Sequence, residues 1–212
     1  MSRSKQKTKP SPRFDAAYYR RYYFNPRTAV TTREQIHALA RLIAAQTRYL
    51  ALPVVRRILD AGCGCGLLRA PLKRLLPEAR YVGLEVSEYL CGRYGWIQGG
   101  IESFRTEQSF SLVICQDVLQ YLNDRAAARA LANLARACDG LLYFSVITDV
   151  DWRANCDRRY TDPPAHLRTA AWYRARLDRG FQEIGGGFWL RRGAGPTLWE
   201  LEKAPARGKA DR

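Results

Sequence analysis

The feature that most constrains the fold is the stretch from residue 54 to residue 66, which reads VVRRILDAGCGCG. Its first part is short, apolar and rich in β-branched side chains, as expected of a strand that is buried on both faces. This strand ends at Asp60, and the leucine-rich sequence that follows predicts a helix. A strand, a glycine turn and a helix in this order direct backbone N–H groups toward a nucleotide-bearing ligand. The glycines of the turn are Gly62, Gly64 and Gly66.

The spacing of these glycines separates two kinds of nucleotide site. The dinucleotide pattern GxGxxG would need its third glycine at position 67, which is occupied by Leu67. The run instead reads DxGxGxG, and it resembles motif I of the Rossmann-like (class I) S-adenosylmethionine-dependent methyltransferases. A glycine turn that serves only packing is the alternative interpretation. The resemblance implies that S-adenosylmethionine is bound by Asp60, Gly62, Cys63, Gly64 and Gly66.

The second predicted strand, residues 80–85 (RYVGLE), ends in an acidic side chain 25 positions after the aspartate of motif I. An acidic residue at this strand end can accept hydrogen bonds from ribose hydroxyls, so Glu85 matches motif II of the family. Val86 is expected beside it in the cofactor site. Many members have an acidic residue where this chain has Gly100. The backbone of Gly100 and Ile101 is therefore expected to hold the adenine.

Residues 110–122, FSLVICQDVLQYL, carry a second strong resemblance to the family. Members often have an apolar strand that leads into a D/E-V-L-x-H-L segment. Tyr121 stands in the place of the usual histidine, which excludes deprotonation by a histidine at this position. The resemblance implies that Gln116 and Val118 contact the cofactor. It makes Asp117 and Tyr121 the catalytic candidates.

Two segments outside these motifs are candidates for the acceptor side. Residues 14–26, FDAAYYRRYYFNP, place four tyrosines within six positions. This segment either covers the cofactor and acceptor pocket as a lid or packs on the core as a short amphipathic helix, and both interpretations stay open. Tyr19 and Tyr23 are predicted to contact the acceptor. Residues 149–162 are expected to form a functional loop after the fifth strand. Asp149, Trp152 and Arg158 are its predicted acceptor contacts, chosen from a wider set of candidates: Asp149, Asp151, Trp152, Asn155, Asp157, Arg158, Arg159 and Tyr160.

Strands that alternate with helices across residues 54–148 predict an α/β fold with a Rossmann-like, doubly wound and mostly parallel sheet. N-terminal helices are expected before it, and Thr31 with Glu34 forms a capping box that opens one of them. At the C-terminal end, FQEIGGGFWLRR and LWELEK are predicted to form an antiparallel hairpin joined through GAGP.

The domain plan follows from these elements and from composition. Residues 54–203 are expected to form the methyltransferase domain, and residues 14–53 a helical lid segment before it. Residues 1–13 and 204–212 are polar tails, which cannot bury enough apolar surface to offset chain entropy and are expected to be disordered. Part of the net charge of +15 lies in these tails. That charge favours solubility or a nonspecific contact with RNA.

The cysteines and the hydropathy pattern indicate the cellular compartment in which the chain is expected to work. Six cysteines without paired C-x-x-C spacing indicate reduced thiols and no metal site. The adjacent helix N-terminus is expected to lower the pKa of the Cys63 or Cys65 thiol. No stretch approaches the ~20 apolar residues of a membrane helix. A cytoplasmic protein without membrane contact is therefore expected.

The leading functional hypothesis is a methyltransferase that uses S-adenosylmethionine on an O, N, S or C acceptor. The sulfonium of the cofactor makes the methyl group electrophilic, which explains the absence of an obvious triad or metal set in the sequence. The aromatic N-terminal segment favours a planar small-molecule acceptor. The alternatives are an RNA methyltransferase and a nucleic-acid-binding protein that keeps only the fold. The oligomeric state stays open.

Overall fold

A computed structural model describes residues 14–25, 27–50, 54–163 and 166–199. The predicted tails lie outside these residues. Within them the chain forms one seven-stranded sheet in the order β3-β2-β1-β4-β5-β7-β6. Only β7 runs in the opposite direction to the other six strands, so the predicted α/β fold with a mostly parallel sheet is confirmed. The strands are β1 (Arg57–Ala61), β2 (Arg80–Glu85), β3 (Ile97–Gln98), β4 (Phe110–Gln116), β5 (Cys138–Ser145), β6 (Phe181–Gly185) and β7 (Phe188–Arg191).

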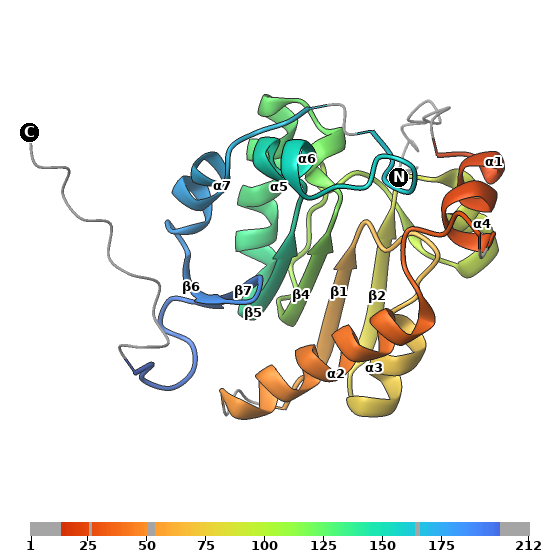
Figure 1. The fold of residues 1–212 in the computed structure, drawn as a ribbon. Coiled ribbons are helices and arrows are strands. Elements are labelled where there is room, and N and C mark those ends of the chain that lie inside the picture. Colours follow the sequence, from red (N-terminus) through yellow and green to blue (C-terminus); the bar gives the residue numbers. More distant parts are fainter. Residues whose placement is uncertain (1–13, 26, 51–53, 164–165, 200–212) are drawn as a thin grey trace, which may run out of the picture.

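Helices cover the sheet and its upper edge (Figure 1). The N-terminal segment and α6 lie near the edge where the parallel strands end, whereas α2 and α3 cross in front of the sheet. None of the helices in the described part of the chain is long and apolar enough to span a membrane. The helices are α1 (Ala16–Tyr19), η1 (Arg20–Phe24), α2 (Arg33–Tyr49), α3 (Arg69–Leu75), α4 (Glu88–Tyr94), η2 (Leu119–Tyr121), α5 (Asp124–Ala137), α6 (Asp149–Ala154) and α7 (Ala170–Leu177).

The central strands are apolar throughout because the sheet has a core on each face. In β4, Leu112 and Ile114 belong to the cluster formed with α2 and α3. Val113 and Cys115 belong to the cluster formed with α5 and α7. All four side chains are fully buried. Alternate residues of a strand point to opposite faces, so a strand covered on both sides needs an unbroken apolar run.

Helix α2 begins one residue later than the sequence pattern indicates. Thr32, not Thr31, is the N-cap, and the capping box pairs it with Gln35 rather than Glu34. The N-cap residue must keep an extended backbone while its side chain accepts from the third helical N–H. Thr32 has φ −99° and ψ 160°, and its hydroxyl accepts from the Gln35 N–H.

A glycine soon after a helical segment often marks the end of the helix, but Gly140 lies inside β5. The helix ends at Ala137, and the strand begins at once with Cys138. A Cβ at Gly140 would lie 2.4 Å from the carbonyl oxygen of Ser111 in the neighbouring strand. The glycine therefore allows two strands to approach closely. Its position after a helix does not show whether a glycine serves this purpose or ends the helix.

The predicted C-terminal hairpin exists, but its two strands both come from FQEIGGGFWLRR. Strands β6 and β7 pair antiparallel across a turn at Gly186 and Gly187. Both glycines have positive φ, which a tight turn between strands requires. The prediction that LWELEK forms the second strand is wrong for Leu198 and Trp199, because neither lies in a strand. The rest of that segment, residues 200–203, lies outside the described residues.

The expected irregular loop at residues 149–162 begins with a helix, α6. Thr148 caps it, and a capping box with Asp151 satisfies the free N–H groups of its first turn. The sequence T-D-V-D carries this signal, which the high polarity of the segment obscures. The residues after Ala154 do form a loop, and it reaches the edge where the strands end.

Candidate functional site

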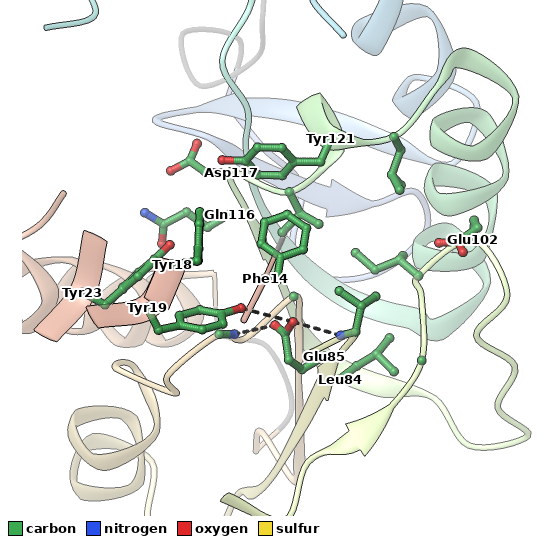
Figure 2. A pocket seen from close by; sticks show the side chains of 17 residues that line it. Phe14, Tyr18, Tyr19, Tyr23, Leu84, Glu85, Glu102, Gln116, Asp117 and Tyr121 are labelled. Carbon is green, nitrogen blue, oxygen red and sulfur yellow. Dashed lines mark hydrogen bonds between the residues drawn. The ribbon is translucent and has the colours of Figure 1, made fainter. Parts of the chain in front are cut away.

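A cavity lies outside the carboxyl ends of β1, β2 and β4, where the strand order reverses between β1 and β4. Such a switch point is where open α/β sheets bind ligands. Figure 2 shows aromatic rings of the N-terminal segment on one side of this first cavity and Glu85 below them. The cavity is lined by Phe14, Tyr18, Tyr19, Tyr23, Gly62, Gly64, Leu84, Glu85, Val86, Gly99, Ile101, Glu102, Gln116, Asp117, Val118, Tyr121 and Leu122.

The glycine loop supplies a bare backbone surface to this cavity. Gly62 and Gly64 have φ of 81° and 52°, a conformation that favours glycine. A Cβ at Gly62 would come within 2.3 Å of Val118, whereas a Cβ at Gly64 would meet nothing within 4 Å. Gly64 thus borders open space, which a ligand can approach along the backbone.

Glu85 is the organising side chain of the first cavity, and it is only 5% exposed. Its Oε1 accepts hydrogen bonds from the N–H groups of Val86 and Ser87, each at 2.9 Å. Its Oε2 accepts from the N–H of Gly64 at 2.9 Å, which ties the glycine loop to the end of β2. The Tyr19 hydroxyl completes the set at 3.5 Å from Oε1 (Figure 2).

Two of the predicted cofactor residues, Gly66 and Gly100, line neither the first cavity nor the second one described below. Gly66 packs against Trp96, whose ring would lie 2.4 Å from an added Cβ. Trp96 also donates its indole N–H to the Gly64 carbonyl at 3.0 Å, so it supports the loop from behind. Gly100 does not line the first cavity, although its neighbours Gly99 and Ile101 do.

Asp60 lies behind the glycine loop and is 5% exposed. The Tyr81 hydroxyl donates a hydrogen bond to its Oδ2. Burial raises the pKa of Asp60 to about 7, because the hydrogen bond from Tyr81 offsets only part of the desolvation. Asp60 borders a second cavity rather than the first one.

The second cavity adjoins the first and is bounded by the glycine loop, α2 and the loop after α6. It contains the expected Tyr23 and Asp117. The expected Tyr19 lines only the first cavity, and Asp149, Trp152 and Arg158 line neither. The lining residues of the second cavity are Tyr18, Tyr23, Val30, Thr31, Gln35, Ile36, Leu39, Asp60, Gly62, Cys63, Gly64, Cys65, Leu67, Leu68, Gln116, Asp117, Gln120, Tyr121, Ile147, Asn155, Cys156, Asp157, Tyr160, Thr161 and Asp162.

The three absent residues have structural partners instead. Asp149 opens α6 and forms an ion pair with Arg153 at 3.3 Å. The guanidinium of Arg158 lies 5.1 Å from the centre of the Trp152 ring, so these two side chains stack on each other. The cavity is reached instead by the residues that follow α6.

Asp117 lies where the two cavities meet. It is the only described residue other than glycine with positive φ, at 54°. This backbone strain occurs at a position that borders both cavities, as is common for functional residues. Its side chain is accessible from the cavities, yet the surrounding protein desolvates it and raises its pKa. Ser145 Oγ donates to its Oδ1 at 2.9 Å and opposes the shift.

A chain of hydrogen bonds crosses the site from the N-terminal segment to the loop after α6. The Tyr18 hydroxyl donates to Tyr121, and the Tyr121 hydroxyl donates to the carboxylate of Asp162. Burial raises the pKa of both phenols, so both keep their protons near neutral pH. In this structure Tyr121 is a protonated hydrogen-bonding group between Tyr18 and Asp162.

The cysteines of the loop do not follow the sequence-based expectation. Burial raises the pKa of the Cys63 thiol, and it raises that of Cys65 to about 12. The negative charge of Glu85 adds to both shifts, so proximity to a helix N-terminus does not produce a thiolate. Among the described residues, no group of three or more His, Cys, Asp or Glu side chains could hold a metal ion.

Comparisons with known proteins agree with this geometry. A family model described as a methyltransferase domain matches residues 58–139. A second one, described as protein-L-isoaspartate(D-aspartate) O-methyltransferase, matches residues 8–94. The first range contains the glycine loop, Glu85 and Asp117, and the second also includes the tyrosine segment. Both models describe methyltransferases, which supports the class I S-adenosylmethionine-dependent family that motif I resembles. No curated protein matches it in sequence.

Solved structures share the fold of this methyltransferase. The N-methyltransferase NodS from Bradyrhizobium japonicum, in complex with S-adenosylhomocysteine, is 22% identical, with a TM-score of 0.55 over 75% of this chain and 86% of that one. The sugar N-methyltransferase KedS8 from Streptoalloteichus is 18% identical, with a TM-score of 0.57 over 74% of this chain and 87% of that one. The magnesium protoporphyrin IX methyltransferase from Synechocystis, with bound S-adenosylmethionine, is 20% identical, with a TM-score of 0.52 over 75% of this chain and 76% of that one.

The residues of the first cavity fit the cofactor of this family. Glu85 offers a carboxylate at the end of β2 for the ribose, and Gly64 leaves the backbone open. Gly99 and Ile101 border the side where an adenine would lie. Sequence reasoning missed Phe14, Gln120 and Asp162. No motif marks these positions, because each reaches the site from a different element.

Proposed function

We propose that this methyltransferase transfers the methyl group of S-adenosylmethionine to a small molecule that enters the second cavity. The observation that carries this proposal is that the two cavities share one wall. A ligand in each would meet across that wall, as direct transfer between two bound molecules requires. The shared residues are Tyr18, Tyr23, Gly62, Gly64, Gln116, Asp117 and Tyr121.

The chain's own residues would bind and align the reactants. Glu85 and the loop backbone would hold the nucleoside, and Asp117 with Tyr121 would face the acceptor. The bound cofactor supplies the electrophilic methyl group. Placement in a preorganised site can contribute ~7–11 kcal/mol to lowering a barrier of this kind. The ring-lined N-terminal segment would exclude water, which favours the lid interpretation of Tyr19 and Tyr23 over plain packing.

A small acceptor is favoured over RNA by the charge of the cavity walls. Among the described residues that line either cavity, none is a lysine, arginine or histidine, although the chain carries a net charge of +15. Phosphates are normally held by such side chains. The structural neighbours named above are, by their titles, an N-methyltransferase, a sugar N-methyltransferase and a magnesium protoporphyrin IX methyltransferase.

Thermal denaturation with added ligands tests the cofactor assignment. S-adenosylmethionine and S-adenosylhomocysteine at 100 times their dissociation constants should each stabilise the protein by about 2.7 kcal/mol, whereas NAD should not. An equal stabilisation by NAD would contradict the assignment of the first cavity.

Labelled S-adenosylmethionine tests the acceptor class. The protein is incubated with a cell extract, and the extract is then separated into small-molecule, RNA and protein fractions. Label in the small-molecule fraction is expected. Label confined to RNA or to protein would overturn the proposed acceptor, and cofactor binding without any label would support a non-catalytic role.

A further inference from the structure

One short segment, residues 116–122, builds much of the wall between the two cavities. It runs from the last residue of β4 through η2 toward the start of α5. Its residues that line one or both cavities are Gln116, Asp117, Val118, Gln120, Tyr121 and Leu122. The position of this segment therefore affects both cavities.

The segment is strained and depends on its neighbours for its shape. Asp117 has a φ of 54°, a conformation that persists in a residue other than glycine only where the surrounding structure enforces it. Val118 packs on the glycine loop, since an added Cβ at Gly62 would lie 2.3 Å from its side chain. A shift of η2 would therefore also disturb the loop that borders the first cavity.

The carbonyl groups of η2 receive donors from the segment that precedes α7. A short helix leaves its last carbonyl groups without partners inside the helix. The backbone N–H of His166 donates to the carbonyl of Gln120 at 2.8 Å. The Nη1 of Arg168 donates to the carbonyl of Leu119 at 3.1 Å, and its Nη2 donates to the carbonyl of Leu122. One side chain thus holds both ends of η2.

The guanidinium of Arg168 is itself buried and fixed in place. Its side chain is 4% exposed, and its Nε donates to Oδ1 of Asp124 in α5 at 2.8 Å. Its Nη1 also donates to the hydroxyl of Tyr173 at 3.2 Å, and the centre of the Trp172 ring lies 4.9 Å from the guanidinium carbon. Arginine suits this place because its donors form a rigid planar fork. Arg168 lines neither cavity.

We propose that Arg168 is a positioning residue, which holds η2 so that Asp117 and Tyr121 keep the geometry required by the ligands of both cavities. It acts through the backbone of η2 and touches neither ligand. This inference rests on the proposed function, which assigns the first cavity to the cofactor and the second to the acceptor. A residue that only stabilised the fold would change the free energy of unfolding but not the affinity of the folded protein for its ligand.

Arg168→Lys separates these two roles. The variant keeps the positive charge, but one ammonium group cannot replace a fork that reaches two carbonyls, a carboxylate and a hydroxyl in different directions. Isothermal titration calorimetry should show S-adenosylhomocysteine binding about fivefold or more weakly than to the wild-type protein. Urea denaturation gives the stability of the same proteins.

Arg191→Lys is the matched control for this substitution. Arg191 also donates to a carbonyl, that of Ala135 at 2.9 Å, and it lines neither cavity. This variant should lose stability but keep its affinity for S-adenosylhomocysteine. Equal affinities of Arg168→Lys and Arg191→Lys would overturn the inference.

Asp124→Ala tests the same contact from the other side and decides the question if Arg168→Lys does not fold. The Asp124 side chain is 77% exposed, so the variant should fold, yet Arg168 loses the partner of its Nε. Hydrogen–deuterium exchange measured by mass spectrometry should be faster at the N–H groups of Tyr121 and Leu122, which hydrogen-bond within η2. The affinity for S-adenosylhomocysteine should fall by about twofold.

Glu34→Ala is the control for the loss of an acidic side chain from the first turn of a helix. Glu34 is exposed in the first turn of α2, as Asp124 is in that of α5, and it lines neither cavity. Its affinity and its exchange at η2 should match the wild-type values. Exchange at η2 that is the same in Asp124→Ala and Glu34→Ala would contradict the role of Arg168.

The inference and the proposed function can be told apart when they fail. If S-adenosylhomocysteine does not bind the wild-type protein, the proposed function fails and the inference fails with it. If the ligand binds the wild-type protein and each variant binds it as tightly as its control does, only the role assigned to Arg168 fails.

Discussion

We expect the Tyr19→Phe variant to bind S-adenosylhomocysteine more tightly than the wild-type protein does. The carboxylate of Glu85 accepts three backbone hydrogen bonds at 2.9 Å and a fourth from the Tyr19 hydroxyl at 3.5 Å. An ionised carboxylate has about four acceptor sites, so the set is full. Ribose hydroxyls can join only if one donor leaves. The backbone donors are fixed in the glycine loop and in the segment after β2, whereas the side chain of Tyr19 can turn away.

The size of the effect follows from the bond that must break. A neutral hydrogen bond contributes about 0.5–1.5 kcal/mol net, and a length of 3.5 Å places this one in the lower half of that range. Removing the hydroxyl beforehand should therefore tighten binding by about twofold to fivefold. Burial and the nearby Glu85 raise the pKa of Tyr19, so the phenol is neutral and the substitution changes no charge.

Isothermal titration calorimetry of S-adenosylhomocysteine with three proteins measures this effect. The wild-type protein and Tyr19→Phe are compared with Tyr22→Phe as the control. Tyr22 belongs to the same segment but lines neither cavity, so its affinity should stay unchanged. Weaker binding by Tyr19→Phe would show that the hydroxyl contacts the bound ligand instead of competing with it. An unchanged affinity would show that Glu85 accepts ribose without losing Tyr19.

Three further predictions concern the loop and its surroundings. Gly64→Val should lose binding of S-adenosylhomocysteine in calorimetry, because φ is 52° and the side chain would enter open cavity space; normal affinity would place the cofactor elsewhere. The double variant Cys63→Ser, Cys65→Ser should fold and bind S-adenosylmethionine, and elemental analysis should find no stoichiometric zinc; zinc lost together with the fold would contradict this. The pKa of Asp60 is raised from 3.8 to about 7, so its contribution to stability is present below about pH 4 and is lost as the pH rises through about 7. Urea midpoints should fall between pH 5 and pH 8 by more in the wild-type protein than in Asp60→Asn, and parallel curves would refute the assigned pKa.

Local sequence was sufficient to predict the parts of the site that come from one continuous segment. The order of strand, glycine turn and helix around Gly62 and Gly64 depends on backbone conformations that few residues can adopt. Glu85 ends β2 as expected, because the apolar run stops at the edge of the sheet. The glycine turn and the position of Glu85 each depend on residues that are neighbours in the sequence. The same residues carry the resemblance to the family.

Boundaries were less predictable where two neighbouring residues could serve the same role. Thr31 and Thr32 both suit an N-cap, and the packing of α2 decides between them. In the sequence Gly66 resembles part of a ligand-binding loop, but in the structure it permits close contact with Trp96. Gly140 resembles a helix stop, but it permits close contact with the Ser111 carbonyl. A glycine in sequence reveals freedom of the backbone but not the neighbour that requires it.

Tyr23 and Asp117 of the acceptor side were predicted from the sequence, but the rest of that side was decided by the tertiary structure. Gln120 and Asp162 lie 42 positions apart, and the fold brings both to one cavity with Tyr18 from the N-terminal segment. Asp149 and Trp152, chosen from their composition, are used by α6 and by a stacked arginine. The periodicity of a segment determines which elements form, because it acts over a few residues. Which polar side chains share a cavity depends on how distant elements pack, and that information lies in no single segment.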